Sequence, residues 1–160
     1  MRLWRVSNYA DLSGEGGRRV AARWHERGRP AVYLAEHPAL ALLETLVHLD
    51  IDPDELPSHY QLLTVEVADA VAVEELSEAA LAALTTNWRH APHDTRTLTR
   101  AWFGERRTAL LRVPSAIVPA AFNYLLNPLH PDAARISVLA RQTAEFDTRL
   151  FRRFTPAGGR

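Results

Sequence analysis

The spacing of hydrophobic and polar residues predicts short strands with a few helices between them. Arg2 to Val6 alternates polar and apolar residues and predicts a first strand. Ala31 to Ala35 predicts a second strand, which the turn residues Gly28 and Pro30 introduce. Glycines at positions 14, 16 and 17 predict a turn-rich loop between these two strands. The further strand candidates are residues 61–67, 109–113, 136–140 and 145–151.

A helix is predicted directly after Pro38, because proline suits the first helical turn. Residues 39–49 carry apolar side chains at helical spacing, and we expect one buried face formed by Ala39, Leu42, Leu43, Leu46 and Val47. Residues 74–84 and 97–107 predict two more helices. Strands and helices mix without a regular strand–helix–strand order and without a repeat. The pattern therefore predicts a single α+β domain with a mostly antiparallel, twisted sheet flanked by helices.

The composition is that of a globular protein of one domain. The 160 residues are 47% hydrophobic and 24% charged, and the formal net charge is zero. This neutral balance argues against general nucleic-acid binding, which draws on a surplus of positive charge. No apolar run approaches the ~20 residues of a membrane span, and the first residues lack the apolar centre of a signal peptide. We therefore expect a cytoplasmic protein that binds neither nucleic acid directly nor a membrane.

Two residue types are missing, and their absence excludes several kinds of chemistry. Without cysteine there is no disulfide, no thiolate zinc ligand and no cysteine nucleophile. All 19 basic residues are arginine, so a Schiff-base lysine and a P-loop lysine are excluded too. An anion site in this chain must use guanidinium or backbone N–H groups. His90 and His93 are spaced as HxxH without further ligands at a suggestive spacing, so we expect no metal site.

Candidate chemistry begins with an acid on the first long helix. Glu44 and His48 are four residues apart and share a helix face, which lies opposite or beside the leucine stripe. They form either a solvated surface pair or the edge of a cleft in which the carboxylate acts as a base or stabilises positive charge. The role of His48 stays open.

Arginine and aromatic residues gather around the first two predicted strands. Arg5 and Arg23 sit at strand-like positions, each beside a tryptophan. Their side chains either extend over aromatic surface or form a phosphate-binding pair. Tyr33 alternates with its apolar neighbours and therefore faces away from them. Its ring belongs either to the core or to a platform for a flat ligand ring.

Polar residues in the last third of the chain give less indication of a functional site. Ser115 follows a proline at a predicted strand end, where serine is typical of a turn or a cap. No Gly-x-Ser-x-Gly motif is present, so we do not expect an acyl-transfer nucleophile. Asn123 and Asn127 are either turn residues or side chains that hold a loop or a ligand amide. The residues alone thus lead to an α+β domain with a candidate site of arginine, glutamate, serine and tyrosine.

Three separated blocks of the sequence resemble one family. They are RLWR near the start, then GGRRVAARWHERGRPAVYLAEHPALALLETLVHL, then LLRVPSAIVPAAFNYLLNPLHPDAARI. These blocks closely resemble the RES-domain proteins, which are named for an arginine, a glutamate and a serine. Such proteins are the toxins of bacterial toxin–antitoxin pairs whose antitoxins carry an Xre-like helix-turn-helix domain. The resemblance covers residues 1–152, and we expect residues 153–160 to be a frayed tail.

The resemblance implies an NAD-consuming enzyme with a core similar to that of the ADP-ribosyltransferase toxins. The family's arginine falls on Arg23, its glutamate on Glu44 and its serine on Ser115. Tyr33 matches the family's aromatic site residue, and Arg5 matches its early arginine. NAD is then a substrate, and no permanently bound cofactor is implied. Some members break NAD down with water or phosphate as acceptor, and some modify a protein.

The resemblance also implies a role for each of these residues. Glu44 would stabilise the positive charge that builds on the ribose as nicotinamide leaves. Arg5 and Arg23 would hold the pyrophosphate. Tyr33 would stack on the nicotinamide or its ribose. Ser115 would form a hydrogen bond with the ribose or the carboxamide and orient the bond to be cleaved.

Three hypotheses for the function follow from the resemblance. The first is an NAD glycohydrolase or phosphorylase that acts as a growth-inhibiting toxin. The second is a mono-ADP-ribosyltransferase with a protein target, and the third is a non-catalytic domain that binds a regulator. The resemblance further implies an Xre-type antitoxin that covers the NAD cleft, and it implies a homodimer. The apolar run over residues 122–126 is a candidate surface for that dimer.

Overall fold

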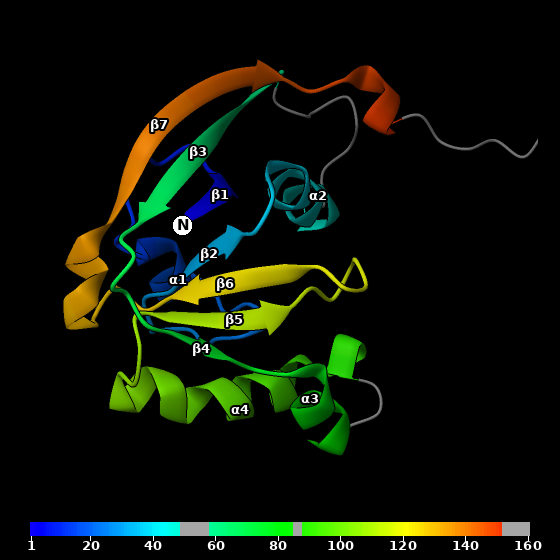
Figure 1. The fold of residues 1–160 in the computed structure, drawn as a ribbon. Helices are drawn as coiled ribbons and strands as arrows, with labels where there is room; N and C mark the ends of the chain where they lie inside the picture. The colour runs from blue at the N-terminus through cyan, green and yellow to red at the C-terminus, as the bar shows by residue number, and fades with distance from the viewer. Residues whose placement is uncertain (49–57, 85–87, 152–160) are drawn as a thin grey trace, which may run out of the picture.

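One seven-stranded sheet organises the molecule, seen here in a computed structural model that describes residues 1–48, 58–84 and 88–151. The strand order is β4-β5-β6-β2-β1-β3-β7, with β4 and β5 parallel and every other neighbouring pair antiparallel (Figure 1). The α+β prediction with a mostly antiparallel sheet is therefore confirmed. The strands are β1 Arg2–Val6, β2 Val32–Ala35, β3 His59–Val67, β4 Val73–Glu75, β5 Leu110–Pro114, β6 Phe122–Leu126 and β7 Ile136–Glu145.

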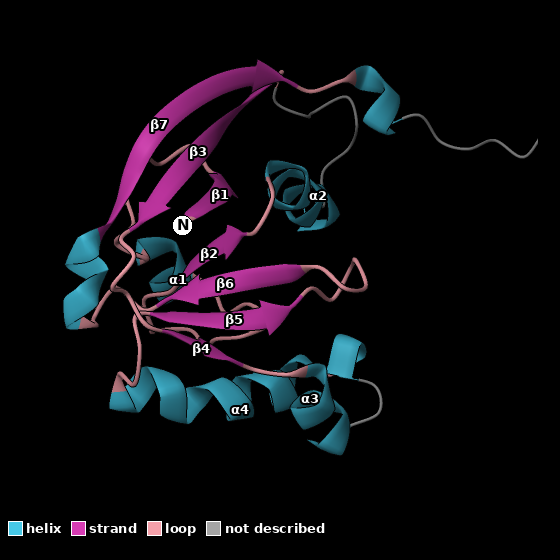
Figure 2. Cartoon of the chain, in the orientation of Figure 1, coloured by secondary structure: helices cyan, strands magenta, loops and turns pink. Residues whose placement is uncertain are grey.

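Four α-helices flank this sheet within the described part of the chain. They are α1 Glu15–Arg19, α2 Pro38–His48, α3 Glu78–Leu84 and α4 Pro92–Glu105. Figure 2 shows α3 and α4 beside β4 and β5, where their side chains pack on the face of the sheet that carries Leu111 and Leu125. Helix α2 lies near the ends of β1 and β2. Short 3-10 helices cover Trp88–His90, Pro131–Arg135 and Thr148–Phe151. The predicted frayed tail, residues 153–160, lies outside the described residues.

The sheet is divided where β1 meets β2. Strand β1 pairs with β3 over five residues, from Arg2 opposite Glu66 to Val6 opposite Leu62. It pairs with β2 only at Trp4, which lies opposite Ala35. In Figure 1 the curved β3–β7 pair arches away from β5 and β6. The single pair between β1 and β2 joins these two halves, and the candidate site lies beside it.

Alternation along β2 sends its side chains to two different cores. Val32 and Leu34 pack in a cluster with residues of β1, β3, β5 and β6. Tyr33 packs on the other side, against a cluster that contains Trp24 and Trp102. The prediction that Tyr33 faces away from its apolar neighbours is confirmed.

Helix α2 buries a different face from the one predicted. Leu40 and Ala41 are its buried residues, whereas Ala39 is exposed and Val47 is 53% exposed. Leu40 and Ala41 pack with Ala35, and Trp4 and Val6 of β1 lie against this small cluster. A small side chain such as Ala41 lets the helix approach the sheet closely. A count of apolar residues does not detect that a small residue is preferred at this contact. The predicted stripe is therefore wrong as the buried face of this helix.

The apolar run at residues 122–126 is an interior strand and not a dimer surface. It forms β6, which pairs with β5 on one side and with β2 on the other. Tyr124, Leu125 and Leu126 are all buried. The run is apolar because both faces of the strand are covered, so its prediction as an exposed surface is wrong.

Several element boundaries also differ from the prediction. Residues 15–19 form the short helix α1 where a loop was expected. Helix α4 begins at Pro92, five residues before the predicted start, because proline at the first helical position needs no intrahelical donor. The stretch 74–84 divides into strand β4 and helix α3. The candidates 136–140 and 145–151 become the long strand β7 followed by a 3-10 helix.

Candidate active site

A cleft of about 430 Å³ opens at the division between β1 and β2. Its wall combines β1, the segment from α1 to His25, β2, one face of α2, and two residues from the region around β6. Four of the predicted site residues line it: Arg5, Arg23, Tyr33 and Glu44. Residues far apart in the sequence therefore meet at the weakest junction of the sheet. The volume is within the range of small-molecule sites.

Glu44 lies on the inward face of α2, one turn after Leu40 and Ala41. Its Oε1 accepts two hydrogen bonds, from the Ser115 hydroxyl at 2.9 Å and from the Asn123 side-chain amide at 2.5 Å. Within the described residues, Oε2 accepts none and is left for the cleft. The carboxylate is thus oriented by two neutral donors and keeps its negative charge available to a ligand.

Ser115 contacts Glu44 and does not itself line the cleft. Its side chain is 1% exposed, and its hydroxyl oxygen accepts hydrogen bonds from the backbone N–H groups of Ile117 and Val118, both at 3.1 Å. The hydroxyl has one proton, which it donates to Glu44. The structure therefore brings Ser115 to the carboxylate, and it gives the serine no hydroxyl proton to spare for a ligand.

Arg23 lies in a tight turn between Ala22 and His25, and not on a strand as its surroundings suggested. Its Nη1 donates to the carbonyl oxygen of Trp88 at 3.3 Å. Burial lowers the pKa of Arg23, and the Glu44 carboxylate opposes that shift. A guanidinium remains charged under these conditions, so Arg23 brings a partly desolvated cation to the cleft.

Helix α4 holds this turn from outside the cleft. Arg96 Nε donates to the carbonyl of Ala22 at 2.7 Å. Thr95 Oγ1 donates to the carbonyl of Arg23 at 2.6 Å, and Thr99 Oγ1 donates to that of Trp24 at 2.5 Å. Three successive carbonyls are thereby satisfied by side chains of one helix, which fixes the turn although it belongs to no sheet ladder.

Arg5 supplies a second cation from β1. Its Nη1 donates a long hydrogen bond, 3.4 Å, to the backbone carbonyl of Asp11. Burial lowers the pKa of Arg5, and the charge of Asp11 partly opposes it. Two guanidinium groups and one carboxylate, Glu44, therefore line the cleft, and its fixed charge favours an anionic ligand.

Tyr33 lines the cleft, and its hydroxyl is held by two residues of the neighbouring turn. The hydroxyl oxygen accepts the backbone N–H of Trp24 at 3.1 Å and lies 2.8 Å from Nδ1 of His25. Burial raises the pKa of Tyr33, so this phenol stays neutral near pH 7.

Sequence reasoning missed two parts of this site. Asn123 was interpreted as a turn residue or as a side chain that holds a loop or a ligand amide, and it proves to be a direct partner of Glu44. His25 was not singled out, although it follows Trp24 directly, lies two residues after Arg23 and lines the cleft. Its position beside the proposed phosphate-binding arginine was the only available signal. His48 also lines the cleft, one helical turn beyond Glu44.

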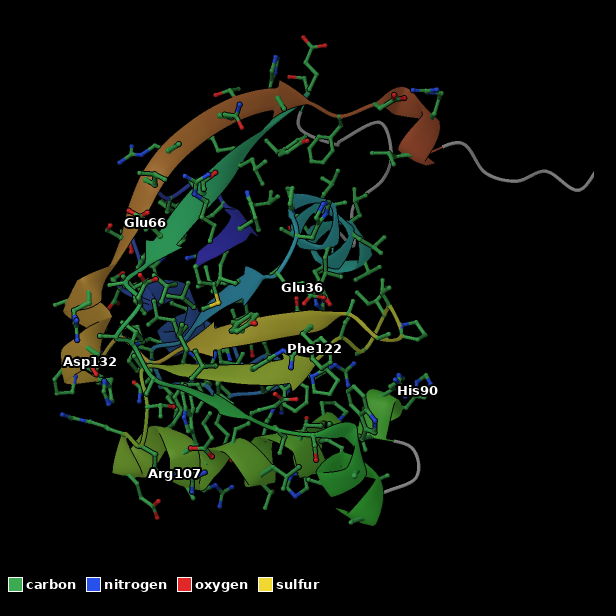
Figure 3. The ribbon with its side chains drawn as sticks, in the orientation of Figure 1. Glu36, Glu66, His90, Arg107, Phe122 and Asp132 are labelled. Atoms are coloured by element: carbon green, nitrogen blue, oxygen red, sulfur yellow. The ribbon has the colours of Figure 1, made fainter. Side chains whose placement is uncertain are left out.

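Among the described residues, no group of three or more histidine, aspartate or glutamate side chains is arranged to hold a metal ion. His90 lies on the 3-10 helix beside α3 (Figure 3) and does not line the cleft. Among the helices described, none combines the length and apolar character that crossing a membrane requires.

Comparison with known proteins identifies the family. The RES domain family matches residues 2–148 of this chain. The chain belongs to the RES-domain family of toxins. It is 48% identical over 153 residues to "Toxin Res" of Pseudomonas putida, covering 94% of this chain and 100% of that protein. It is 38% identical over 162 residues to the "Prs ADP-ribosylating toxin" of a Sphingobium species, covering 94% and 97%.

A solved structure shares the fold of this RES-domain chain. It is a chain of the M. tuberculosis MbcT–MbcA toxin–antitoxin complex, which superposes with a TM-score of 0.70. The match covers 94% of this chain and 86% of the other, at 22% sequence identity. At this level of identity the likeness supports the fold alone.

Proposed function

We propose that this RES-domain protein is the toxin of a toxin–antitoxin pair and that it cleaves NAD at the bond between nicotinamide and ribose. The observation that carries the proposal is the Glu44 carboxylate, held by Ser115 and Asn123 in a cleft that also contains two arginines and an aromatic ring. The family resemblance supplies NAD as the substrate. Each charged residue in the cleft can be assigned a role in binding or cleaving NAD.

Glu44 would stabilise the charge that develops during bond cleavage. As nicotinamide leaves as a neutral base, its positive charge passes to the ribose, whose transition state resembles an oxocarbenium ion. A carboxylate already oriented toward this position needs no reorganisation as the charge appears. Such an interaction contributes about 3–4 kcal/mol, by analogy with the loss of one oxyanion-hole donor.

The remaining residues would bind the dinucleotide and orient the bond. Guanidinium groups bind phosphate oxygens through paired N–H donors, so Arg5 and Arg23 fit the pyrophosphate. The Tyr33 ring offers a flat apolar surface for nicotinamide or its ribose. Ser115 would act on the ligand only through Glu44, since its hydroxyl donates its hydrogen bond to that carboxylate. We therefore assign Ser115 and Asn123 as positioning residues.

The identity of the acceptor separates two candidate reactions. With water or phosphate as acceptor, the products are nicotinamide and ADP-ribose or its phosphorylated form, and cellular NAD is depleted. With a protein as acceptor, the same cleavage step transfers ADP-ribose to a side chain. The name of the Sphingobium relative, an ADP-ribosylating toxin, favours this second candidate. Both reactions share an ADP-ribosyltransferase-like core and the same role for Glu44.

An antitoxin partner completes the proposal. A toxin–antitoxin complex is the source of the similar solved structure, and the resemblance implies an Xre-type helix-turn-helix protein as partner here. The net charge of zero suits a toxin that leaves DNA binding to its antitoxin. A homodimer stays a prediction, now without the surface first assigned to it.

The test is to incubate the purified, antitoxin-free protein with NAD, with and without inorganic phosphate, and to identify the products by mass. Free nicotinamide with ADP-ribose indicates water as acceptor, and a phosphorylated ADP-ribose indicates phosphate. Labelled NAD added to a cell extract tests for a modified protein. NAD that remains intact in all three reactions would overturn the enzymatic proposal and favour a regulator-binding domain.

A further inference from the structure

We propose that His25 is a positioning residue of the cleft. Its imidazole is neutral and carries its proton on Nε2, and its Nδ1 accepts a hydrogen bond from the Tyr33 hydroxyl. The consequence is that Tyr33 offers its ring to the ligand and keeps its hydroxyl proton away from it. The effect on catalysis rests on the function proposed above, whereas the protonation state of the ring does not.

The hydrogen-bond partners determine the tautomer. Nε2 of His25 lies 3.1 Å from the carbonyl oxygen of Gly17 and 3.1 Å from that of Val20. Carbonyl oxygens only accept, so Nε2 must carry a proton. A neutral imidazole has one N–H, which leaves Nδ1 as an acceptor. The Tyr33 hydroxyl, 2.8 Å from Nδ1, is then the donor in that contact.

The surroundings favour the neutral ring. His25 is 3% exposed, and burial lowers its pKa, although the two carbonyl oxygens partly oppose that shift. The positive charges of Arg96 and Arg29 lower it further. No carboxylate contributes to the balance among the described residues. A second proton on His25 would also place an N–H opposite the Tyr33 hydroxyl and force that hydroxyl to turn its own proton elsewhere.

This one ring joins the turn that carries it to two other segments of the cleft wall. It connects the carbonyls of Gly17 and Val20, at the end of α1, with Tyr33 on β2. The contact is tight on the α1 side, because a Cβ built on Gly17 would come within 2.9 Å of Nε2. Gly17, Val20 and Tyr33 all line the cleft. The ring therefore fixes the place of the aromatic surface relative to the rest of the site.

The first test measures the tautomer in the protein without ligand. Long-range proton–nitrogen NMR of histidine-labelled protein between pH 6 and 8 should show Nε2 protonated and Nδ1 as an unprotonated acceptor for His25, assigned by comparison with the His25→Asn variant. A ring protonated on Nδ1, or on both nitrogens, would overturn the proposal. Because no NAD is present, this result is independent of the proposed reaction.

The second test separates the two ends of the ring by substitution. His25→Asn places an amide oxygen near Nδ1 and can still accept the Tyr33 hydroxyl, whereas His25→Gln places an amide N–H near Nε2 and keeps only the carbonyl contacts. With both variants folded, we expect kcat/KM for NAD to fall about tenfold more in His25→Gln than in His25→Asn. Equal losses in the two variants would contradict a role through Tyr33.

A double-mutant cycle checks that the two residues act as one unit. His25→Gln and Tyr33→Phe each remove the same contact, so the double variant should lose little more than either single variant, in kcat/KM and in the free energy of unfolding. Losses that multiply would show independent roles and overturn the proposal. If the wild-type protein does not cleave NAD, the unfolding cycle and the NMR result still decide the question.

Discussion

The side-chain amide of Asn123 lies 2.5 Å from Oε1 of Glu44, although 79 positions separate the two residues in the sequence. Asn123 is on the buried strand β6 and Glu44 is on helix α2, so the contact ties the helix to the interior of the sheet. It occupies one oxygen of the carboxylate and fixes the direction of the other. The central acid of the cleft is therefore oriented by the fold before any ligand binds.

Replacing Glu44 by glutamine removes the negative charge and keeps the side-chain size. We expect kcat for NAD cleavage to fall about 10²- to 10³-fold, because a preorganised opposite charge is lost from the transition state. Product formation by mass is the measurement, together with growth of cells that express the variant. Glu66→Gln is the matched control, since Glu66 is exposed on β3, toward the β7 side of the molecule (Figure 3). Equal activity of both variants would refute the assigned role of Glu44.

Ser115→Ala and Asn123→Ala each remove one donor to the carboxylate. We expect kcat to fall by roughly tenfold in each, with a smaller change in KM, because the acid is still present but is less well oriented. In the Glu44→Gln background the same substitutions should have little further effect on kcat. An undiminished tenfold effect in that background would mean that Ser115 or Asn123 acts on the ligand directly.

Arg23→Gln removes a cation proposed to bind pyrophosphate. We expect KM for NAD to rise about 10- to 100-fold with a smaller change in kcat, since a hydrogen bond to a charged group is worth ~1.5–3 kcal/mol. Arg27→Gln is the control from the same arginine-rich segment, because Arg27 is exposed and does not line the cleft. Steady-state kinetics on the pair distinguishes a specific contact from a general effect of charge. A similar rise in both variants would argue for the general effect.

Two neighbouring glycines of α1 should respond differently to substitution by alanine. A Cβ on Gly17 would come within 2.8 Å of the Arg29 carbonyl and 2.9 Å of the Ala31 nitrogen. Because these are backbone atoms, we expect Gly17→Ala to destabilise the protein by about 1–3 kcal/mol. A Cβ on Gly16 meets nothing within 4 Å, so Gly16→Ala should be neutral or stabilise by up to ~1 kcal/mol. Urea unfolding of both variants measures the difference, and equal stabilities would contradict the packing described for α1.

Burial of His25 should make stability depend on pH in a defined direction. The pKa of this ring is lowered in the folded state, so between that value and the unfolded value of about 6.5 the unfolded chain binds more protons. Its contribution is therefore complete above pH ~6.5 and is lost as the pH falls through the lowered folded pKa. We expect the unfolding free energy of the wild type to fall more steeply below pH 6.5 than that of His25→Asn. Parallel profiles would mean that the histidine is not buried as a neutral ring.

Sequence reasoning grouped the candidate residues better than it placed the elements that carry them. The resemblance put five residues in one candidate site: Arg5, Arg23, Tyr33, Glu44 and Ser115. The first four line one cleft, and Ser115 contacts Glu44 without lining it. The alternation on β2 also gave the direction of Tyr33 correctly. Both signals are local, since one depends on short motifs and the other on the two-residue period of a strand.

Predictions failed where the answer depends on distant neighbours. The leucine stripe of α2 was the most apolar face, yet the helix buries the face of Leu40, Ala41 and Glu44, because small side chains allow contact with β1. The run 122–126 was read as exposed because a strand covered on both faces has no polar alternation. A hydrophobic segment indicates that its side chains are buried. Which strands or helices bury them depends on the order of the strands in the sheet.

The three carbonyls that α4 holds behind Arg23 have a practical consequence. A mutational library restricted to positions facing the cleft would leave out Thr95, Arg96 and Thr99, none of which lines it. Exchanges that remove these donors would leave the backbone carbonyls of the turn that carries Arg23 without their partners. A library meant to change what the cleft binds should therefore include a helix that lies outside its lining.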